Sequence, residues 1–199
     1  MKQINKLGDC DVKLIGGQIM SRVTANLDKG DEAIGTIKVI IPKSIHPDGT
    51  IDISEVPEEH LRVEPDQKKV VKAGDIVMKL STPYDAALVD EDSEGSIVPS
   101  FCAIVKPGDK IDPNYLLAFL NSDFCKEQLK LQVTGTVMSV LSVGKVANVK
   151  FPLPDMKKQK EIGESFIESQ NKLKLIRQIA ALESKKNDVI IRELVKEYE

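Results

Sequence analysis

The stretch Gly74–Leu80, Gly-Asp-Ile-Val-Met-Lys-Leu, decides the fold class of this chain. A Gly-Asp turn leads into a largely apolar run that ends before Thr82-Pro83, which is a pattern typical of a buried β-strand. Similar runs lie on both sides of it, at Thr36–Ile41, Ala86–Val89 and Ile97–Val105. Residues 1–154 are therefore predicted to form a β-rich body.

The segments around these runs predict turns and two helices. The polar stretch Asp90–Gly95 is predicted to be the turn of a hairpin between the runs that flank it. Asp112-Pro113 predicts a helix start, because Asp caps free backbone amides and Pro in the first turn loses no hydrogen bond. A second short helix is expected over Asp123–Leu131, and strand and turn over Val137–Val149. Phe151–Pro154 is expected to be a stiff extended link.

The composition changes after this link, since residues 155–199 contain one Gly and no Pro. Apolar residues recur there at alternating spacings of four and three, which predicts a helix with an apolar stripe. The stripe consists of Ile162, Phe166, Leu173, Ile176, Ala180, Ile190 and Leu194. It is interrupted where the same register passes through Ser169, Glu183 and Asn187.

A straight helix of about 40 residues is roughly 60 Å long, too long to bury its stripe on a body of this size. We therefore expect it to pack against another helix, from a second copy or a partner, as in a coiled coil. The alternative is a helical hairpin that folds back near Ser184–Asp188. The sequence thus predicts an α+β fold, with a mixed β-rich domain over residues 1–154 and a helical arm over residues 155–199.

Charge and composition limit the classes of function. The net charge is −3, with 18 basic and 22 acidic residues in 1–154 and 10 basic and 9 acidic in 155–199. A DNA-binding chain of this charge must sort its cations onto one face, or rely on a partner for phosphate contacts. Cys10, Cys102 and Cys125 lack metal-ligand spacing and are expected to be free thiols in a reducing cytoplasm. No run is long enough to cross a membrane, and the first residues lack a signal peptide's apolar core.

Two loops resemble parts of enzymes, and each lacks an essential component. Ser81–Tyr84 is similar to the Asn/Asp/Ser-Pro-Pro-Tyr tetrapeptide of amino-methyltransferases, but the first Pro is missing and the sequence has no Gly-rich cofactor loop. Asp90–Gly95 begins like a calcium loop, in which position 12 must be a bidentate Glu. That position is Phe101, so a solvated turn is expected.

Two further patterns also fail as catalytic sites. Pro154-Asp155 and Glu183-Ser184-Lys185 resemble a nuclease pattern, yet both lie along the expected arm, tens of ångströms apart. The two histidines, His46 and His60, lie in turn-like sequence and are expected to be surface residues. We therefore expect no catalytic residue, no metal site and no cofactor.

A succession of short elements carries a family resemblance across nearly the whole chain. The elements, in order, are Leu7-Gly8-Asp9, Gly16-Gly17, Gly74–Leu80, Ile97–Val105, Asp112–Leu116, Phe119–Ser122, Thr134-Gly135-Thr136, Leu141-Ser142, Phe151–Pro154, Gln159 and Ile162. Their order and spacing resemble the target-recognition domain of the specificity subunit of bacterial type I restriction–modification enzymes.

The resemblance implies a mixed α/β recognition domain, a helical region behind it, and no catalysis in this subunit. Partner subunits of that family supply adenine-N6 methylation from S-adenosylmethionine and, in full complexes, ATP-driven translocation and cleavage. With one recognition domain and one arm, the chain looks like a half-subunit. A homodimer through the arms would then recognise a palindromic split target. The alternative is an assembly or regulatory protein that pairs through its arm and does not recognise DNA.

DNA recognition needs side-chain donors and acceptors on exposed loops, together with phosphate contacts. The candidates are Gln18, Ser21, Arg22, Lys43, Ser44, Lys79, Ser81, Tyr84, Thr134, Thr136 and Ser139. Lys79, Tyr84 and Arg22 are the strongest of these. Each of the candidates has the alternative of being an ordinary surface polar group.

Overall fold

The computed structural model describes residues 4–133 and 140–198 and contains a central antiparallel sheet of four strands. The strands lie in the order β2 (Val12–Gly16), β7 (Cys102–Pro107), β5 (Ile76–Lys79) and β6 (Ala86–Leu88). The predicted strand after Gly74-Asp75 is confirmed as β5. Ile76, Val77 and Met78 are all fully buried, because helices cover one face of the sheet and an irregular layer covers the other.

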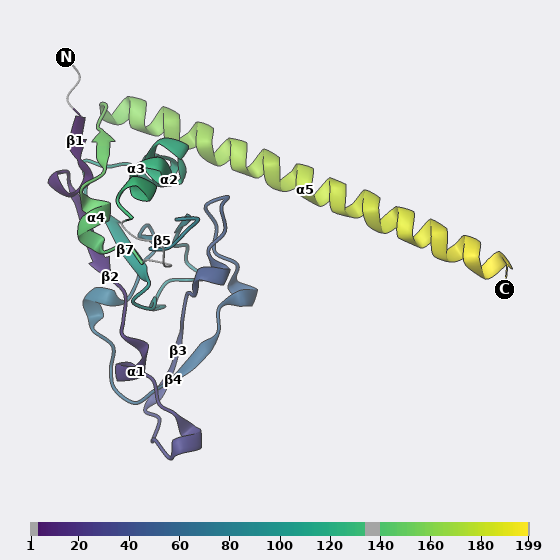
Figure 1. Ribbon diagram of the computed structural model, residues 1–199, viewed down its shortest axis with the longest axis horizontal. Coiled ribbons are helices and arrows are strands. Elements are labelled where there is room, and N and C mark those ends of the chain that lie inside the picture. The colour runs from purple at the N-terminus through teal and green to yellow at the C-terminus, as the bar shows by residue number, and fades with distance from the viewer. Residues whose placement is uncertain (1–3, 134–139, 199) are drawn as a thin grey trace.

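Two short ribbons flank the sheet (Figure 1). One pairs β1 (Ile4–Lys6) with β8 (Lys150–Pro152), so the expected extended link begins as a strand. The other pairs β3 (Gly35–Lys38) with β4 (Glu58–Leu61). The strand predicted over Thr36–Ile41 is therefore present only as far as Lys38. Val39, the next residue, forms an isolated β-bridge with Ile97.

The hairpin expected around Asp90–Gly95 is wrong. β6 pairs with β5 and not with β7, so the hairpin turn is the segment 80–85. After β6 the chain passes through the Asp90–Gly95 turn to another layer, where Ile97 pairs with Val39 and Val70. Sequence adjacency suggested the wrong partner because β5 is inserted between β6 and β7.

The helices over the sheet largely follow the sequence. α2 (Pro113–Asn121) begins after Asp112, whose carboxylate accepts a hydrogen bond from the Tyr115 amide at 2.9 Å. α3 (Asp123–Leu131) has the bounds expected. α1 (Met20–Val23) is a single turn. α4 (Val143–Ala147) corrects the expectation of strand and turn, because Val143 and Val146 lie three residues apart on one helix face that packs on the core.

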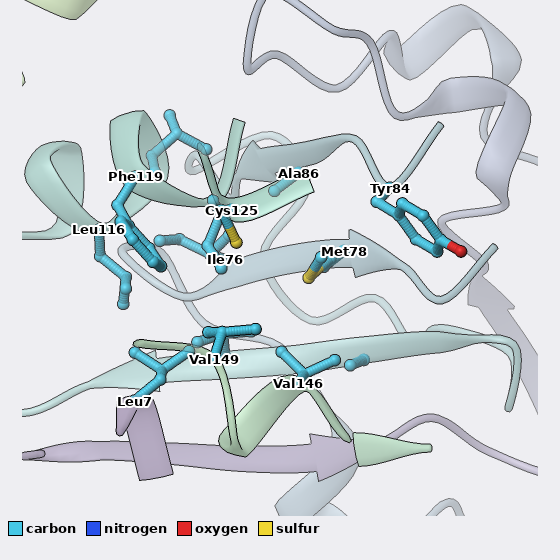
Figure 2. Close-up of a cluster of buried hydrophobic side chains, with 14 of the residues drawn as sticks. Leu7, Ile76, Met78, Tyr84, Ala86, Leu116, Phe119, Cys125, Val146 and Val149 are labelled. Atoms are coloured by element: carbon cyan, nitrogen blue, oxygen red, sulfur yellow. The ribbon is translucent and has the colours of Figure 1, made fainter. Parts of the chain in front are cut away.

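The two faces of the sheet bury different residues of β5, as the period of a strand requires. Ile76 and Met78 face α2 and α3, and Figure 2 shows Leu116, Phe119 and Cys125 gathered around Ile76. Val77 faces the opposite layer. That layer includes Ile40, Ile45, Ile51, Val71 and Val98.

The arm is one continuous helix, α5 (Met156–Tyr198), about 65 Å long at 1.5 Å per residue. It runs unbroken through Ser184–Asp188, so the alternative of a helical hairpin is wrong. Its first turns pack on α2, and the rest of the helix extends away from the body (Figure 1). Every described side chain from Asn171 onward is exposed. No helix in the described part of the chain is long and apolar enough to cross a membrane.

Gln159 and Gly163 fix the start of α5 against α2. The Gln159 side chain is buried, accepts from the Asp112 amide at 2.9 Å and donates to the carbonyls of Lys110 and Pro154 at 3.2 and 3.0 Å. A Cβ on Gly163 would lie 2.7 Å from the Cβ of Asn114. The two helices therefore approach at a distance that only glycine permits.

We expect Gly163→Ala to destabilise the fold by about 1–3 kcal/mol, although Ala normally favours a helix over Gly by about 1 kcal/mol. The reason is the collision with α2. Gly144→Ala in α4 is the control, because its Cβ would meet no atom closer than 3.9 Å. Urea unfolding followed by circular dichroism measures both variants. A Gly163→Ala chain as stable as Gly144→Ala would show that the packing of α5 on α2 is looser.

Candidate nucleic-acid interface

The loops that carry most of the expected DNA contacts gather at one end of the sheet. Because neighbouring strands are antiparallel, β2 and β5 end there at Gly16 and Lys79, and β7 and β6 begin there at Cys102 and Ala86. We call this end, with the loops that leave it, the Gly16 end. Figure 1 shows α1, which follows β2, on one side of the sheet and α5 on the opposite side.

The segment after β2 is held backbone to backbone against the turn before β7. The Gly17 amide donates to the Cys102 carbonyl at 3.0 Å, and the Gln18 amide donates to the Val98 carbonyl at 2.7 Å. A Cβ on Gly17 would lie 2.2 Å from the Pro99 carbonyl oxygen, so only glycine permits this approach. The segment is thus a rigid support for the residues that follow it.

Cations from distant parts of the sequence surround this segment. The Lys69 ammonium donates to the Gly17 carbonyl at 2.9 Å. The Arg62 guanidinium donates to the carbonyls of Ser21 at 2.9 Å and Arg22 at 3.4 Å, at the carboxyl end of α1. Side chains of Ser21, Arg22 and Arg62 are exposed. The chain thus sorts several cations onto one end despite its negative net charge.

A buried ion cluster holds the loop between β5 and β6. The Asp85 carboxylate accepts from Lys79 at 2.9 Å and from Lys126 of α3 at 2.7 Å. The exposed fractions of the Lys79, Asp85 and Lys126 side chains are 13%, 4% and 16%. Asn121 of α2 adds hydrogen bonds to both the amide and the carbonyl of Ala86. Two helices and a strand therefore fix this loop.

The charge state of Asp85 follows from its two partners. Burial alone would raise the pKa of the Asp85 carboxyl. The hydrogen bonds and charges of Lys126 and Lys79 outweigh burial and hold that pKa below its ordinary value. Asp85 is therefore ionised at neutral pH, and the cluster carries one net positive charge.

The structure separates the candidate residues by position and by exposure. Ser21, Arg22 and Ser81 lie at the Gly16 end and reach solvent. Gln18, Ser44 and Tyr84 are buried, with 6%, 0% and 2% exposure, so the expectation of exposed loop side chains is wrong for them. Lys79 is held by Asp85. Lys43 is exposed but pairs with Glu55 at 2.8 Å, in a separate segment. Thr134, Thr136 and Ser139 lie outside the described residues.

Burial of Tyr84 and Ser44 has a structural cause. The segment 80–85 turns inward at Tyr84, whose ring belongs to the same buried hydrophobic cluster as Met78 (Figure 2). Ser44 donates its hydroxyl to the Ile41 carbonyl at 2.8 Å within the turn Pro42–Ser44. Gln18 differs from both, because its amide nitrogen is buried without a hydrogen-bond partner among residues 4–133 and 140–198.

Sequence reasoning missed three residues at the Gly16 end. These are Arg62, Lys69 and Phe101. Arg62 and Lys69 contact residues 40 to 52 positions away, and no local pattern encodes such contacts. Phe101 falls within the apolar run Ile97–Val105, which predicts a buried strand residue, but it lies in the turn before β7 and is 43% exposed.

Other reactive groups of the described residues have structural partners. His46, Asp52 and Glu55 place one ligand atom each within 4.8 Å of one another, but Lys43 pairs with Glu55 and Ser54 donates twice to Asp52. We therefore assign no metal to this cluster. Burial raises the pKa of the Cys102 and Cys125 thiols to about 12, so neither is a nucleophile at neutral pH.

Comparison with known proteins identifies this arrangement. Residues 65–184 match the family model described as the type I restriction modification DNA specificity domain. The chain is 28% identical over 131 residues to the type I restriction enzyme MjaVIII specificity subunit of Methanocaldococcus jannaschii. That alignment covers 63% of this chain and 30% of the relative.

Two solved structures share the fold. The HsdS subunit from Thermoanaerobacter tengcongensis aligns with a TM-score of 0.64 at 19% identity, over 94% of this chain and 47% of its own length. A chain from a structure of complex assembly and conformational transition in the type I R-M system gives a TM-score of 0.67 at 19% identity, with the same coverage. The chain thus spans less than a third of the curated relative and about half of each solved chain.

The resemblance expected from the sequence is confirmed by these matches, and so is the α+β fold with a long carboxyl-terminal helix. The family is one of specificity subunits, as expected for a chain without a catalytic role. The matched range begins before β5 and ends within α5, so it covers β5, β6 and β7 of the sheet and the larger part of the arm. The chain belongs to the type I restriction–modification DNA specificity domain family.

Proposed function

We propose that this chain recognises one half of a split double-stranded DNA target for a partner adenine methyltransferase, and itself catalyses no reaction. The Gly16 end carries the proposal, because it combines a rigid backbone support with exposed cations and polar side chains in a member of a DNA specificity family. Of the DNA-contacting residues expected from the sequence, Ser21, Arg22 and Ser81 reach solvent at this end, and we propose these three as DNA contacts. Acting on DNA, the protein would work in the cytoplasm.

The charge of the body fits a DNA reader that depends on a partner. Residues 1–154 carry 18 basic and 22 acidic residues, fewer cations than an autonomous DNA-binding domain needs. The cations at the Gly16 end would set the position of the duplex locally, through phosphate contacts. The methyltransferase subunit, and in full systems a restriction subunit, would supply the remaining phosphate contacts.

We divide the chain functionally into a recognition domain over residues 1–154 and a dimerisation and docking arm over residues 155–199. Leu173, Ile176, Ile190 and Leu194 of the expected stripe are between 43% and 60% exposed. Such a stripe is self-complementary in a two-fold dimer, so a second copy is the proposed partner. The two recognition domains would then meet a palindromic split target.

The arm has a second apolar stripe that the sequence analysis did not identify. Leu175, Ile179, Leu182 and Val189 follow spacings of four, three and seven and are 53% to 64% exposed. One partner helix covers only one stripe of this width. The second stripe therefore supports an additional helical partner, for which we propose the methyltransferase subunit.

An assembly or regulatory protein that does not recognise DNA is the second candidate, and the acidic balance of the body favours it. Such a protein would keep the arm and its partners but would show no dependence on cations at the Gly16 end. Binding to duplex DNA in the presence of a type I methyltransferase subunit separates the two candidates.

We expect Arg22→Ala to weaken DNA binding by the chain–methyltransferase complex and to reduce the slope of log affinity against log salt by about one, as loss of one phosphate contact requires. Lys110→Ala is the control, because Lys110 is also exposed but lies beyond the opposite end of the sheet. Fluorescence anisotropy over a salt series measures both slopes. Equal effects of the two substitutions would exclude the Gly16 end as the DNA interface.

A further inference from the structure

Phe101 is an exposed aromatic residue on a hydrogen-bonded turn at the Gly16 end. Its exposed fraction is 43%, and Ser100 before it is also exposed, whereas Pro99 and Cys102 at the two ends of the turn are buried. The Cys102 amide donates to the Pro99 carbonyl at 2.8 Å, and the Phe101 carbonyl accepts from the Leu80 amide at 3.0 Å. The ring is therefore carried by a turn whose backbone is hydrogen-bonded on both sides, not by a free loop.

The turn lies between the two groups of residues proposed to contact DNA. On one side, Gly17 contacts Pro99 and bears the Lys69 ammonium on its carbonyl. On the other side, Leu80 leads directly into Ser81. A duplex that contacts both sides must pass over Phe101.

We propose that Phe101 contacts a base in the DNA interface, with its ring packed against the 5-methyl group of a thymine in the major groove. This inference rests on the proposed function. A phenyl ring has no hydrogen-bonding group, so it cannot satisfy the donors and acceptors that base edges present. The thymine methyl is the apolar group of the major groove, and packing against it removes apolar surface of both partners from water.

Phe124 provides a contrast within the same chain. It is 51% exposed on α3, and its ring lies 6.4 Å from that of Phe119, which in turn lies 4.8 Å from Phe151 of β8. Phe124 thus belongs to an aromatic row on the side of β8. It has the same chemistry and a similar exposure but no place at the Gly16 end, so Phe124→Ala is a matched control.

The test selects bound sequences from a pool of duplexes with randomised sequence, using the chain in complex with a type I methyltransferase subunit. One pool contains thymine and a second contains 2′-deoxyuridine in its place. Wild type and Phe124→Ala are expected to enrich a target with a preferred thymine. Phe101→Ala is expected to lose about a fourfold preference at that position, the value of one buried methyl group, with the other positions unchanged. Wild type should lose the same preference in the deoxyuridine pool.

The salt dependence of affinity distinguishes this role from a structural one. Loss of an apolar contact releases no additional counterions, so Phe101→Ala should keep the wild-type salt slope and thermal midpoint. A thymine preference that persists in Phe101→Ala, or a wild-type preference that persists with deoxyuridine, would overturn the inference and leave the proposed function intact. A wild-type complex that enriches no sequence from either pool would overturn the proposed function, and this inference with it.

Discussion

Asp85→Asn is expected to lower the free energy of unfolding by about 3–5 kcal/mol, because it leaves a buried cation without its counter-ion. The amide oxygen of Asn can accept from one lysine, and the second ammonium, 16% exposed or less, remains unpaired. This loss is a large share of the roughly 5–15 kcal/mol that stabilises a typical domain. Urea unfolding at neutral pH, followed by circular dichroism, measures it.

The stability that Asp85 contributes depends on pH, because only the ionised carboxylate pairs with the two lysines. The folded-state pKa of Asp85 is lowered, so its contribution is fully present above the unfolded-state pKa of about 3.9 and is lost as pH falls through the folded-state pKa. The difference in stability between wild type and Asp85→Asn should therefore be constant above about pH 5 and shrink in stronger acid. Glu55→Gln is the control, because its partner Lys43 is 74% exposed and solvent screens the pair, which therefore contributes little to stability. Equal losses in the two variants would contradict the buried cluster.

Ile176→Glu is expected to raise the Kd of the dimer by two orders of magnitude or more. Burial of one Ile side chain is worth about 1.5–3 kcal/mol, and this binding free energy is lost twice because both protomers of a two-fold dimer carry the substitution. Because Ile176 is 60% exposed within one chain, the body should remain folded. Sedimentation equilibrium should show the mass fall from twice 22.0 kDa toward 22.0 kDa.

Gln178→Glu is the matched control for this variant, since Gln178 is exposed and lies two residues from Ile176, about 200° around α5 and so on the opposite side of the helix. It adds the same charge without removing apolar surface and should leave the dimer intact. A wild-type chain that is monomeric over the measured range would show that α5 pairs with a different helix. An Ile176→Glu chain that remains dimeric would place the interface elsewhere.

The sequence correctly predicted the elements whose ends are marked by residues next to them in the chain. The capping carboxylate of Asp112 marked the start of α2, and the Gly-Asp turn marked β5. The long Pro-free segment marked α5. The hairpin failed because strand pairing depends on β5, which enters the sheet between two sequence neighbours. α4 failed because five residues give too short a period to distinguish helix from strand.

The interface was only partly predictable for a similar reason. Exposure of Ser21 and Arg22 follows from their position after a glycine-rich strand end. Tyr84 and Lys79 were expected in solvent, but the loop turns inward to fill the core and to satisfy Asp85. Arg62 and Lys69 reach the site through hydrogen bonds between residues far apart in the sequence. A single sequence contains no signal for such contacts.

A chain that reads a DNA sequence must bind its target more tightly than other duplexes, so its specificity ratio tests DNA recognition. The affinity of the chain–methyltransferase complex for a selected duplex would be compared with its affinity for a scrambled duplex of the same composition, at an ionic strength of about 0.15 M. We expect a ratio of about 10³ or more, with two half-sites in the selected duplex. Equal affinities for the two duplexes would contradict it and leave the chain with an assembly role.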